Sequence, residues 1–156
     1  MHNETYLTEE VAPVFFGSAV NNFAIQEMLD QFIEIAPTPR ARETNEGEID
    51  PERNKFSGFV FKIHANLDPK HRDRCDCLRV CSGKFERNKF FHHVRLDKGL
   101  RFSNPTSFMA KDKSVIDNAY PGDVIGFSDT AHYKIGDPLT QCDKFTVKRI
   151  PRFTPH

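Results

Sequence analysis

The sequence of 156 residues has no tryptophan, no net formal charge and no apolar run long enough to cross a membrane. The missing apolar run argues against a transmembrane helix. The start, Met-His-Asn-Glu-Thr-Tyr, also lacks the basic end and apolar stretch of a secretory signal. We therefore expect a cytoplasmic protein that does not act at a membrane. Phenylalanine, with 15 residues, supplies much of the apolar material for a core of ordinary size.

Motifs of common enzyme sites are missing as well. The sequence contains no Gly-x-x-x-x-Gly-Lys-Ser/Thr phosphate loop, no Gly-x-Gly-x-x-Gly turn and no Gly-x-Ser-x-Gly elbow. Ser18 could be a nucleophile, but no neighbouring residue marks a base for it. We do not expect this chain to be an enzyme by itself, and no catalytic residue is predicted.

The cysteine pattern does not indicate a metal site. Cys75, Cys77 and Cys81 are spaced so that one continuous strand would carry all three on the same face. Zinc sites favour cysteine pairs two to four residues apart, and no second pair faces Cys77 and Cys81. The neighbours His92 and His93 would point to opposite faces of a strand and cannot chelate one ion together. We expect reduced cysteines that act as small strand residues, with no metal.

Charge is distributed unevenly along the chain. Residues 1–53 carry eleven acidic and three basic side chains, whereas residues 69–101 carry ten basic and four acidic ones. An acidic segment is most simply a solvated surface. Clustered Lys and Arg side chains are typical of a surface that meets a phosphate-rich partner.

The first part of the chain resembles the end of an α/β domain. A buried strand is expected at Val14, followed by the turn at Gly17 to Ala19. Within 22–36, Ile25, Met28, Leu29, Phe32 and Ile33 follow the 3.6-residue period of an amphipathic helix. Asn21 or Asn22 could cap this helix, and Pro37 ends it. Without a partner sheet, the apolar stripe would be exposed.

From residue 54 onward the apolar pattern predicts β-structure. The preceding stretch, 38–53, is charged and rich in proline, which is typical of a linker. Beyond it, apolar residues alternate with a period of two, and turn signals separate the alternating segments. We expect a mainly β fold with a small closed barrel over 54–150 and one helical turn at Ser114 to Asp117. The alternating residues are Phe59, Phe61 and Ile63, then Leu78 and Val80, Val94 and Leu96, and Phe145 and Val147.

Several segments together resemble bacterial peptide chain release factor 3. They begin with Pro-Val-Phe-Phe-Gly-Ser-Ala-Val-Asn-Asn-Phe at 13–23 and Phe-Ser-Gly-Phe-Val-Phe-Lys-Ile at 56–63. Asp-Pro-Lys-His-Arg-Asp-Arg at 68–74 and Leu-Arg-Val-Cys-Ser-Gly-Lys-Phe at 78–85 follow. Ala-Tyr-Pro-Gly-Asp-Val-Ile-Gly at 119–126 and Ile-Gly-Asp-Pro-Leu-Thr at 135–140 complete the likeness. Some pieces are shared with elongation factor G, and the 68–74 run favours the release factor.

The resemblance implies a fragment of a translational GTPase that promotes departure of the stop-codon-reading release factors from the ribosome. Residues 1–37 would be the end of the GTPase domain, 54–150 the second, β-barrel domain, and 151–156 the lead into a third domain. Gly17, Ser18 and Ala19 match the family's last guanine-recognition motif, where small side chains line the base pocket. The parent would bind GTP or GDP with magnesium. This chain lacks the phosphate loop and Asn-Lys-x-Asp, so we expect no tight nucleotide binding.

The resemblance also implies that the barrel contacts ribosomal RNA and relays the nucleotide state, with no role for DNA. Ala24 and Pro121 depart from residues common in the family, where Gly and Ala are usual. Two alternatives remain: a fragment of another translational GTPase, such as elongation factor G or a ribosomal protection protein, and a stand-alone barrel that binds RNA or protein. The candidate RNA contacts are Lys70, His71, Arg72, Arg74, Arg79, Lys84, Arg87 and Lys89.

Overall fold

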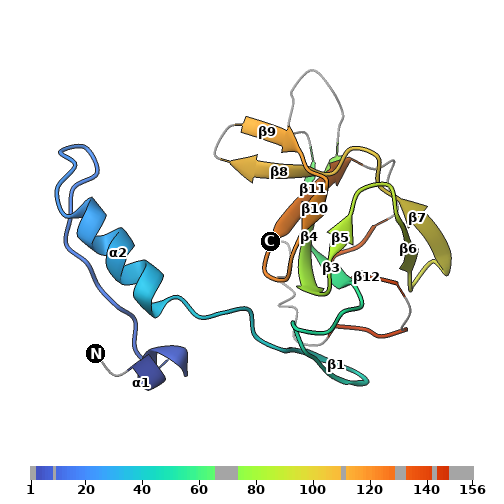
Figure 1. The fold of residues 1–156 in the computed structure, drawn as a ribbon, viewed down its shortest axis with the longest axis horizontal. Helices are drawn as coiled ribbons and strands as arrows, with labels where there is room; N and C mark the ends of the chain where they lie inside the picture. Colours follow the sequence, from blue (N-terminus) through green and yellow to red (C-terminus); the bar gives the residue numbers. More distant parts are fainter. Residues whose placement is uncertain are drawn as a thin grey trace, which may run out of the picture. The chain divides into compact units, whose positions relative to one another are not determined.

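The structure is a computed structural model that describes residues 3–8, 10–65, 74–109, 112–128, 133–141 and 144–147. The chain divides into two units, Met1–Thr38 and Pro39–His156, which are described separately. The first unit contains two helices, α1 (Asn3–Leu7) and α2 (Ile25–Ile35) (Figure 1). The second is built from strands: β1 (Arg42–Thr44), β2 (Gly47–Ile49), β3 (Ser57–Ala65), β4 (Arg74–Ser82), β5 (Phe85–Glu86), β6 (Phe90–His93), β7 (Lys98–Arg101), β8 (Thr106–Met109), β9 (Asp112–Val115), β10 (Asn118–Ala119), β11 (Val124–Ser128) and β12 (Pro138–Thr140).

Helix α2 confirms the helix predicted from the apolar spacing, but not its expected cap. The helix follows Ala24, whose φ of 56° is left-handed, and no side-chain hydrogen bond caps it within the described residues. The predicted caps, Asn21 and Asn22, instead lie in the preceding turn. The helix ends before Pro37, as predicted, and the Ala36 N–H donates to the carbonyl of Phe32 at its last turn.

The apolar face of α2 is exposed, as expected for a helix without a partner sheet. The predicted buried strand at Val14 was wrong: Val14 is 74% exposed and lies outside regular structure. A strand needs a neighbouring strand for its backbone hydrogen bonds, and none pairs with this segment among the described residues of the first unit. Large apolar side chains exposed in this unit are Val11, Val14, Phe15, Phe16, Val20, Phe23, Leu29, Phe32 and Ile33.

The second unit confirms the mainly β prediction. Eight strands form one antiparallel sheet in the order β7-β6-β12-β3-β4-β11-β8-β9, which curls into a half-barrel (Figure 1). Among the described residues its ends, β7 and β9, are not paired with each other. Strands β5 and β10 form a separate antiparallel pair, as do β1 and β2. No helix in the described part of the chain is long and apolar enough to span a bilayer.

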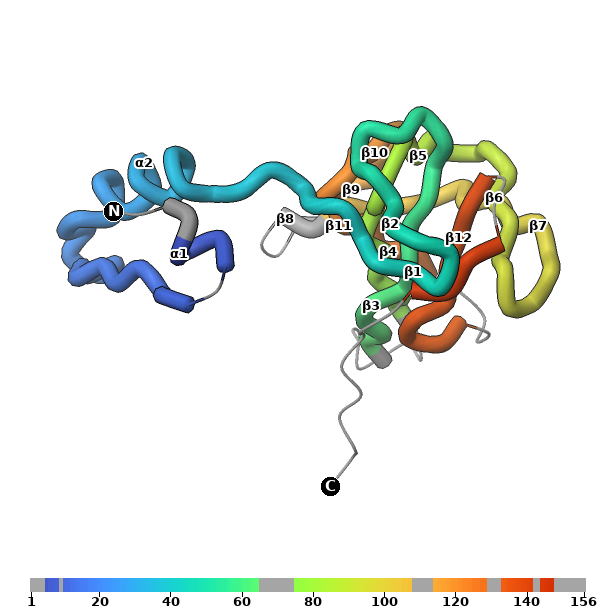
Figure 2. The backbone as a smooth tube through the Cα atoms, turned by 90° about the horizontal axis from the view of Figure 1, so that it is seen from below, coloured from blue at the N-terminus to red at the C-terminus, as the bar shows by residue number. Residues whose placement is uncertain are grey.

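The β1–β2 hairpin lies within the stretch 38–53 that the sequence predicted to be a linker. Its anchoring residues are Thr44 and Ile49, which are 3% and 5% exposed. Asn45 Oδ1 accepts the Thr146 N–H at 2.6 Å, and Thr44 forms a β-bridge with Val147. Figure 2 shows the hairpin against this C-terminal part of the unit. Contacts with residues about a hundred positions away therefore give structure to a segment with little apolar content.

A bulge in β3 divides the apolar residues that the sequence placed on one strand face. The pairing of β3 with β4 shifts between Val60 and Lys62. An extra residue in a strand reverses the faces beyond it. As a result, Phe59 and Phe61 pack in a small cluster with Ile49, whereas Ile63 packs against the main core.

Three other local predictions differ from the structure. Ser114 lies in β9 and pairs with Ser107 of β8, so no helical turn forms there. Strand β6 ends at His93, and Val94 to Asp97 form a turn in which His93 Nδ1 accepts the Leu96 N–H at 3.2 Å. Near the C-terminus, Val147 makes only an isolated bridge. Side-chain hydrogen bonds and strand pairing override the local pattern at these positions.

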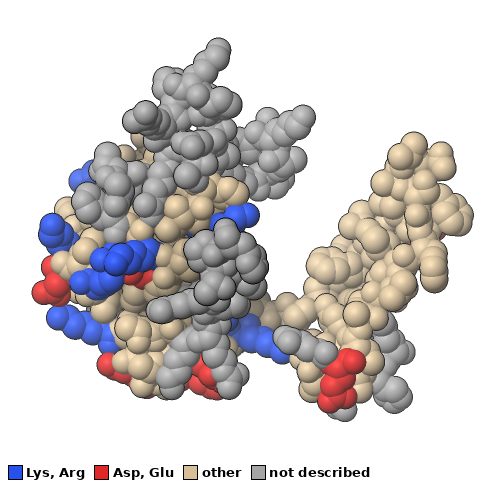
Figure 3. Space-filling model, turned by 180° about the vertical axis from the view of Figure 1, so that it is seen from behind, with Lys and Arg blue, Asp and Glu red and all other residues tan. Residues whose placement is uncertain are grey.

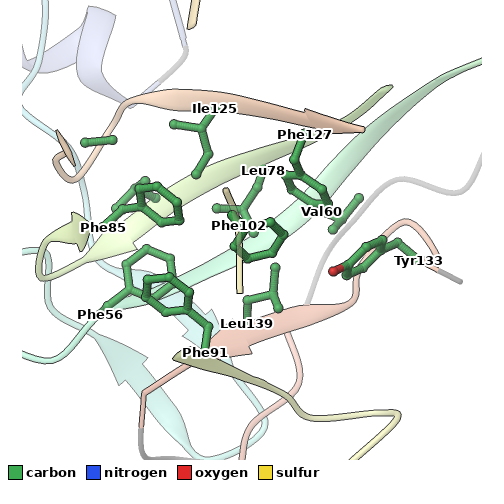
Figure 4. Close-up of a cluster of buried hydrophobic side chains, with 12 residues drawn as sticks. Phe56, Val60, Leu78, Phe85, Phe91, Phe102, Ile125, Phe127, Tyr133 and Leu139 are labelled. Carbon is green, nitrogen blue, oxygen red and sulfur yellow. The ribbon is translucent and has the colours of Figure 1, made fainter. Parts of the chain in front are cut away.

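Phenylalanine rings fill the main core (Figure 4). Phe85 stacks on Phe91 with ring centroids 5.0 Å apart, and Phe56 contacts Phe91 at 4.6 Å. Burial of one large side chain contributes roughly 1.5 to 3 kcal/mol. The core packs the inner sides of β3, β4, β5, β6, β11 and β12 together, with these buried members: Phe56, Val60, Leu78, Val80, Phe85, Phe91, Phe102, Ala119, Ile125, Phe127, Tyr133 and Leu139.

Candidate nucleic-acid interface

The predicted guanine-binding residues lie in a tight turn before α2. Ser18 and Phe23 exchange backbone hydrogen bonds of 3.0 and 2.9 Å, which closes the turn around Ala19. The Ser18 hydroxyl accepts the Asn21 N–H at 3.3 Å. A Cβ on Gly17 would lie 2.9 Å from the Phe23 carbonyl oxygen, so only glycine allows this approach. The turn brings Gly17, Ser18 and Ala19 together, and their contact with guanine stays a prediction.

The predicted RNA contacts lie on both described and undescribed parts of the chain. Lys70, His71 and Arg72 fall outside the described residues, and Arg74 is described only as the first residue of β4. Arg79 is exposed in the middle of β4. The remaining candidates, Lys84, Arg87 and Lys89, lie around β5.

Acidic neighbours compensate part of the charge around β5. Both Lys84 and Lys89 form ion pairs with Glu86. The hydrogen bond from Lys89 is the main reason that the pKa of Glu86 is lowered. Arg87 contacts Asp117 Oδ1 at 3.3 Å and donates from Nε to the Ser103 carbonyl at 2.6 Å. Positive and negative side chains are therefore mixed on this surface. Figure 3 shows Lys and Arg side chains together with Asp and Glu on one face of the molecule.

Two cations that the sequence reasoning missed lie near Arg79. The Arg42 guanidinium lies 5.0 Å from the centre of the Phe59 ring, and Phe59 pairs with Arg79 between β3 and β4. Arg42 and Arg79 are both close enough to lower the pKa of the Cys81 thiol, but burial dominates and raises it to about 11. Lys62 is exposed, and its charge lowers the pKa of the Cys77 thiol, as Arg42 and Arg79 do for Cys81. Their separation from Arg79 along the sequence gave no local signal.

Three cysteines confirm the expectation that they are reduced residues of a strand. Cys75, Cys77 and Cys81 carry thiols that form no disulfide bond with one another, and all three are buried along β4. Burial is the main cause that raises the pKa of the Cys77 thiol, and the neighbouring Cys75 raises it further. Thiols with raised pKa values are poor nucleophiles and poor metal ligands at neutral pH. The described residues contain no group of three His, Cys, Asp or Glu side chains arranged for a metal ion.

A buried charged network connects the end of β6 with the start of β12. Asp137 is 5% exposed and receives two hydrogen bonds from Arg95, of 2.7 and 2.6 Å. The Lys134 N–H donates to the same carboxylate at 2.8 Å, and His93 Nε2 lies 3.1 Å from it. These contacts fix the Gly136-Asp137 turn, whose backbone bonds to Val60 of β3. The network has a structural role, because its groups are directed at one another.

The pKa values of the network follow from burial and charge. Burial alone would raise the pKa of Asp137, but the Arg95 guanidinium and the Lys134 N–H stabilise the carboxylate and hold that pKa below its ordinary value. Burial is the main cause that lowers the pKa of His93. The Asp137 carboxylate opposes this shift, and the charge of Arg95 adds to it, so the pKa stays below its ordinary value. His93 Nδ1 accepts the Leu96 N–H, which also fits a neutral imidazole. Asp137 is therefore charged and His93 neutral at pH 7.

A surface hollow of about 270 Å³ borders the edge strand β7. Its lining mixes aromatic side chains with serine, asparagine and arginine, a combination suited to a polar ligand with an apolar part. One lining residue, Arg101, pairs across the β6–β7 hairpin with Phe90, which is 71% exposed. The hollow is lined by Leu100, Arg101, Phe102, Ser103, Asn104, Phe127, Ser128 and Tyr133.

Comparison of the fold with solved structures gives a match that covers most of the chain. A protein of Thermus thermophilus of known crystal structure matches with a TM-score of 0.69 over 91% of the chain, at 20% identity. At this identity the match shows the fold alone. The chain covers 20% of that protein, so it spans about a fifth of its length.

The sequence match to a protein family covers the strands from β3 to β12. Residues 55–142 match the sequence model of the family described as elongation factor G domain 2. This region is more than half of the chain and contains the eight-stranded sheet, its core and the hollow. The chain therefore belongs to the elongation factor G domain 2 family.

Proposed function

We propose that this chain is part of a translational GTPase that acts in termination, with a barrel that docks on ribosomal RNA and relays the nucleotide state. The observation that carries the proposal is the elongation factor G domain 2 match over 55–142. The likeness of the 68–74 run to release factor 3 supports the finer assignment. The partners would be the ribosome and the stop-codon-reading release factors, in the cytoplasm.

The basic residues of the barrel support an RNA contact. Arg79, Arg42 and Lys62 come from β4, β1 and β3, so the fold gathers cations from distant parts of the sequence. Lysine and arginine neutralise phosphates without reading sequence, and their binding weakens with salt. Such contacts would orient the barrel on the ribosome.

The turn before α2 supports nucleotide binding by the parent protein. Gly17, Ser18 and Ala19 offer small side chains and turn N–H groups of the kind that can line a flat base. In the parent, GTP or GDP with magnesium would bind there together with a phosphate loop and Asn-Lys-x-Asp. This chain contains neither motif, so catalysis is assigned to the parent alone.

Sedimentation of the chain with bacterial ribosomes tests the docking proposal. Four phosphate contacts would weaken binding about a hundredfold between about 50 and 200 mM salt. Reversal of charge in Arg72→Glu with Arg74→Glu should weaken binding at low salt, whereas Lys134→Glu, at an exposed site beyond the candidate contacts, should not. Binding that does not change with salt would point to apolar docking and contradict the RNA contact.

A second candidate, a fragment of an elongation factor G-like GTPase, is favoured by the description of the matching family. Reading the open reading frame that encodes the chain distinguishes both GTPase candidates from a stand-alone barrel. A phosphate loop and Asn-Lys-x-Asp upstream are expected for either GTPase. The encoded full protein then decides between them: release of a labelled stop-codon-reading factor from terminated ribosomes supports the first candidate, and stimulation of translocation alone supports the second.

A further inference from the structure

Two adjacent phenylalanines of β6 have opposite surroundings. Phe91 is 1% exposed and lies in the core, whereas Phe90 is 71% exposed on the outer face of the strand. Neighbouring side chains of a strand point to opposite faces, so the core gains nothing from an aromatic residue at 90. A role for the Phe90 ring must be sought on the surface.

The surroundings of Phe90 leave the ring open and place one cation beside it. Arg101 of β7 is its direct partner across the hairpin, whereas Lys89, which precedes it in the sequence, is already paired with Glu86. Gly99 lies on the same outer face, and a Cβ built there would be 3.9 Å from Phe90 Cδ1. A larger residue at 99 would cover one side of the ring, so the glycine keeps it accessible.

The acidic group at the far end of the hairpin does not cancel this charge. Asp97 Oδ1 lies 3.1 Å from Lys144 Nζ and 3.2 Å from His92 Nε2. The hydrogen bond from Lys144 is the main reason that the pKa of Asp97 is lowered. The outer face of the β6–β7 hairpin thus presents an aromatic ring with Arg101 beside it, and its acid is already paired.

Arg101 also connects Phe90 with the hollow beyond β7. It lines the hollow together with Ser103, Asn104 and Ser128, whose side chains can hydrogen-bond to a sugar or a base edge. Going across the hairpin from β6 to the edge strand β7, the Phe90 ring comes first, then the Arg101 guanidinium, which also lines the polar hollow.

We propose that Phe90 and Arg101 bind an unpaired nucleotide of RNA, with the base stacked on Phe90 and its phosphate paired with Arg101. This inference rests on the proposed function, since it assigns a binding site to the RNA contact. Stacking on an aromatic side chain is tolerant of sequence because every base has a π-face, and arginine adds a directed pair with phosphate. Duplex RNA, whose bases are paired and stacked, would gain only the charge contacts.

The absence of tryptophan from the chain allows a direct test of stacking. Phe90→Trp places the single indole at the proposed site, and a stacked base should quench its fluorescence. The probe is a short single-stranded adenosine oligonucleotide added to the full chain. Phe32→Trp, which replaces another exposed phenylalanine on α2, is the matched control. Quenching of Phe90→Trp but not of Phe32→Trp supports the site, and equal or absent quenching overturns it.

Two further variants test the affinity of the same oligonucleotide. Phe90→Ala should weaken binding by about tenfold, as expected for loss of one stacked base. Gly99→Val should have a similar effect because it covers the ring, and its strand position tolerates a β-branched residue. Binding within twofold of the unmodified chain in both variants overturns the proposal. Displacement of the oligonucleotide by an oligoglutamate peptide at equal affinity also overturns it, because it would show charge attraction alone.

The failure of this inference differs from the failure of the proposed function. If the unmodified chain sediments with ribosomes in a salt-dependent manner while Phe90→Ala binds RNA normally, only the stacking site fails. If Phe90→Trp is quenched while the chain does not bind ribosomes, the stacking site holds and the ribosomal assignment fails.

Discussion

Arg95 and Asp137 form a two-point ion pair, with Nε 2.7 Å from Oδ1 and the second guanidinium nitrogen 2.6 Å from Oδ2. The two residues are 42 positions apart and connect the turn after β6 to the start of β12. Asp137 is buried, so removal of one partner of this ion pair would destabilise the fold more than removal of a partner in a surface pair. This contact holds one edge of the β3–β12 pairing in place.

Replacement Asp137→Asn should destabilise the second unit. The amide would retain the shape of the carboxylate but lose the charge that binds Arg95, and one of its donor N–H groups would face Lys134 N–H. We expect a loss of about 2 to 3 kcal/mol in the free energy of unfolding, measured with urea. The exposed Asp97→Asn should change it by less than about 0.5 kcal/mol. Equal effects of the two variants would contradict a special role for Asp137.

The buried His93 should make stability depend on pH below neutrality. Its pKa is lowered in the folded state, so the unfolded chain binds a proton more readily. Stability is then fully present above the ordinary histidine pKa of about 6.5 and falls as the pH drops below it, by at most about 1.4 kcal/mol per unit. Urea unfolding of the chain at several pH values between about 7 and 5 measures this slope. In His93→Gln the slope should be smaller, and an unchanged slope would assign it to another group.

The pKa of Asp137 shifts in the same direction but acts in a lower range. Its folded pKa is lowered, so its contribution is present above the ordinary aspartate pKa and is lost as the pH falls through the folded value. The two residues therefore act in different pH ranges: His93 begins to act below its ordinary pKa of about 6.5, and Asp137 only below the ordinary aspartate pKa of about 3.9. Asp137→Asn should reduce the slope in the acid range. The Asp137 carboxylate raises the pKa of His93, so its loss should lower that pKa further and make the slope below the ordinary histidine pKa steeper.

Local periodicity was sufficient to predict α2 and the β-rich part, because both depend on neighbours along the sequence. Local periodicity could not predict the β1–β2 hairpin, because Asn45 bonds to Thr146 at a separation of 101 residues. The bulge between Val60 and Lys62 was also invisible, since it changes the face of Ile63 without changing the alternation of residue types. Non-local pairing decided these segments.

In the candidate site, too, some residues could be predicted from the sequence and others depend on non-local pairing. The residue pattern predicted a turn at Gly17, Ser18 and Ala19, and the structure brings them together in one. The likeness to a family added their contact with guanine, which stays a prediction. The open Phe90 ring had a signal that was not used, because one of two adjacent phenylalanines in a strand must face outward. Arg101 has no such signal, since only the pairing of β6 with β7 places it opposite Phe90.

Gly83→Ala, which adds one methyl group, should strongly destabilise the second unit. Gly83 has φ of 63°, and a Cβ there would lie 2.5 Å from both the Lys55 carbonyl carbon and the Phe56 nitrogen. Backbone atoms cannot rotate away as a side chain can, so β3 and β4 would have to separate locally. We expect a loss of more than about 3 kcal/mol in urea unfolding. Gly47→Ala is the control: its φ of 115° is strained for alanine but nothing lies within 4 Å, so a smaller loss is expected.

Phe91→Ala and Phe90→Ala should separate stability from binding at two neighbouring positions. Phe91 is buried and stacked on Phe85 at 5.0 Å, so its truncation leaves a cavity and should cost about 3 to 5 kcal/mol. Phe90 is 71% exposed, and its truncation should change the free energy of unfolding by less than about 0.5 kcal/mol. Thermal or urea unfolding of both variants measures the difference. A large loss of stability in Phe90→Ala would mean that the ring supports the fold. Weaker RNA binding by that variant would then be explained by misfolding, and it would not support a stacking surface at Phe90.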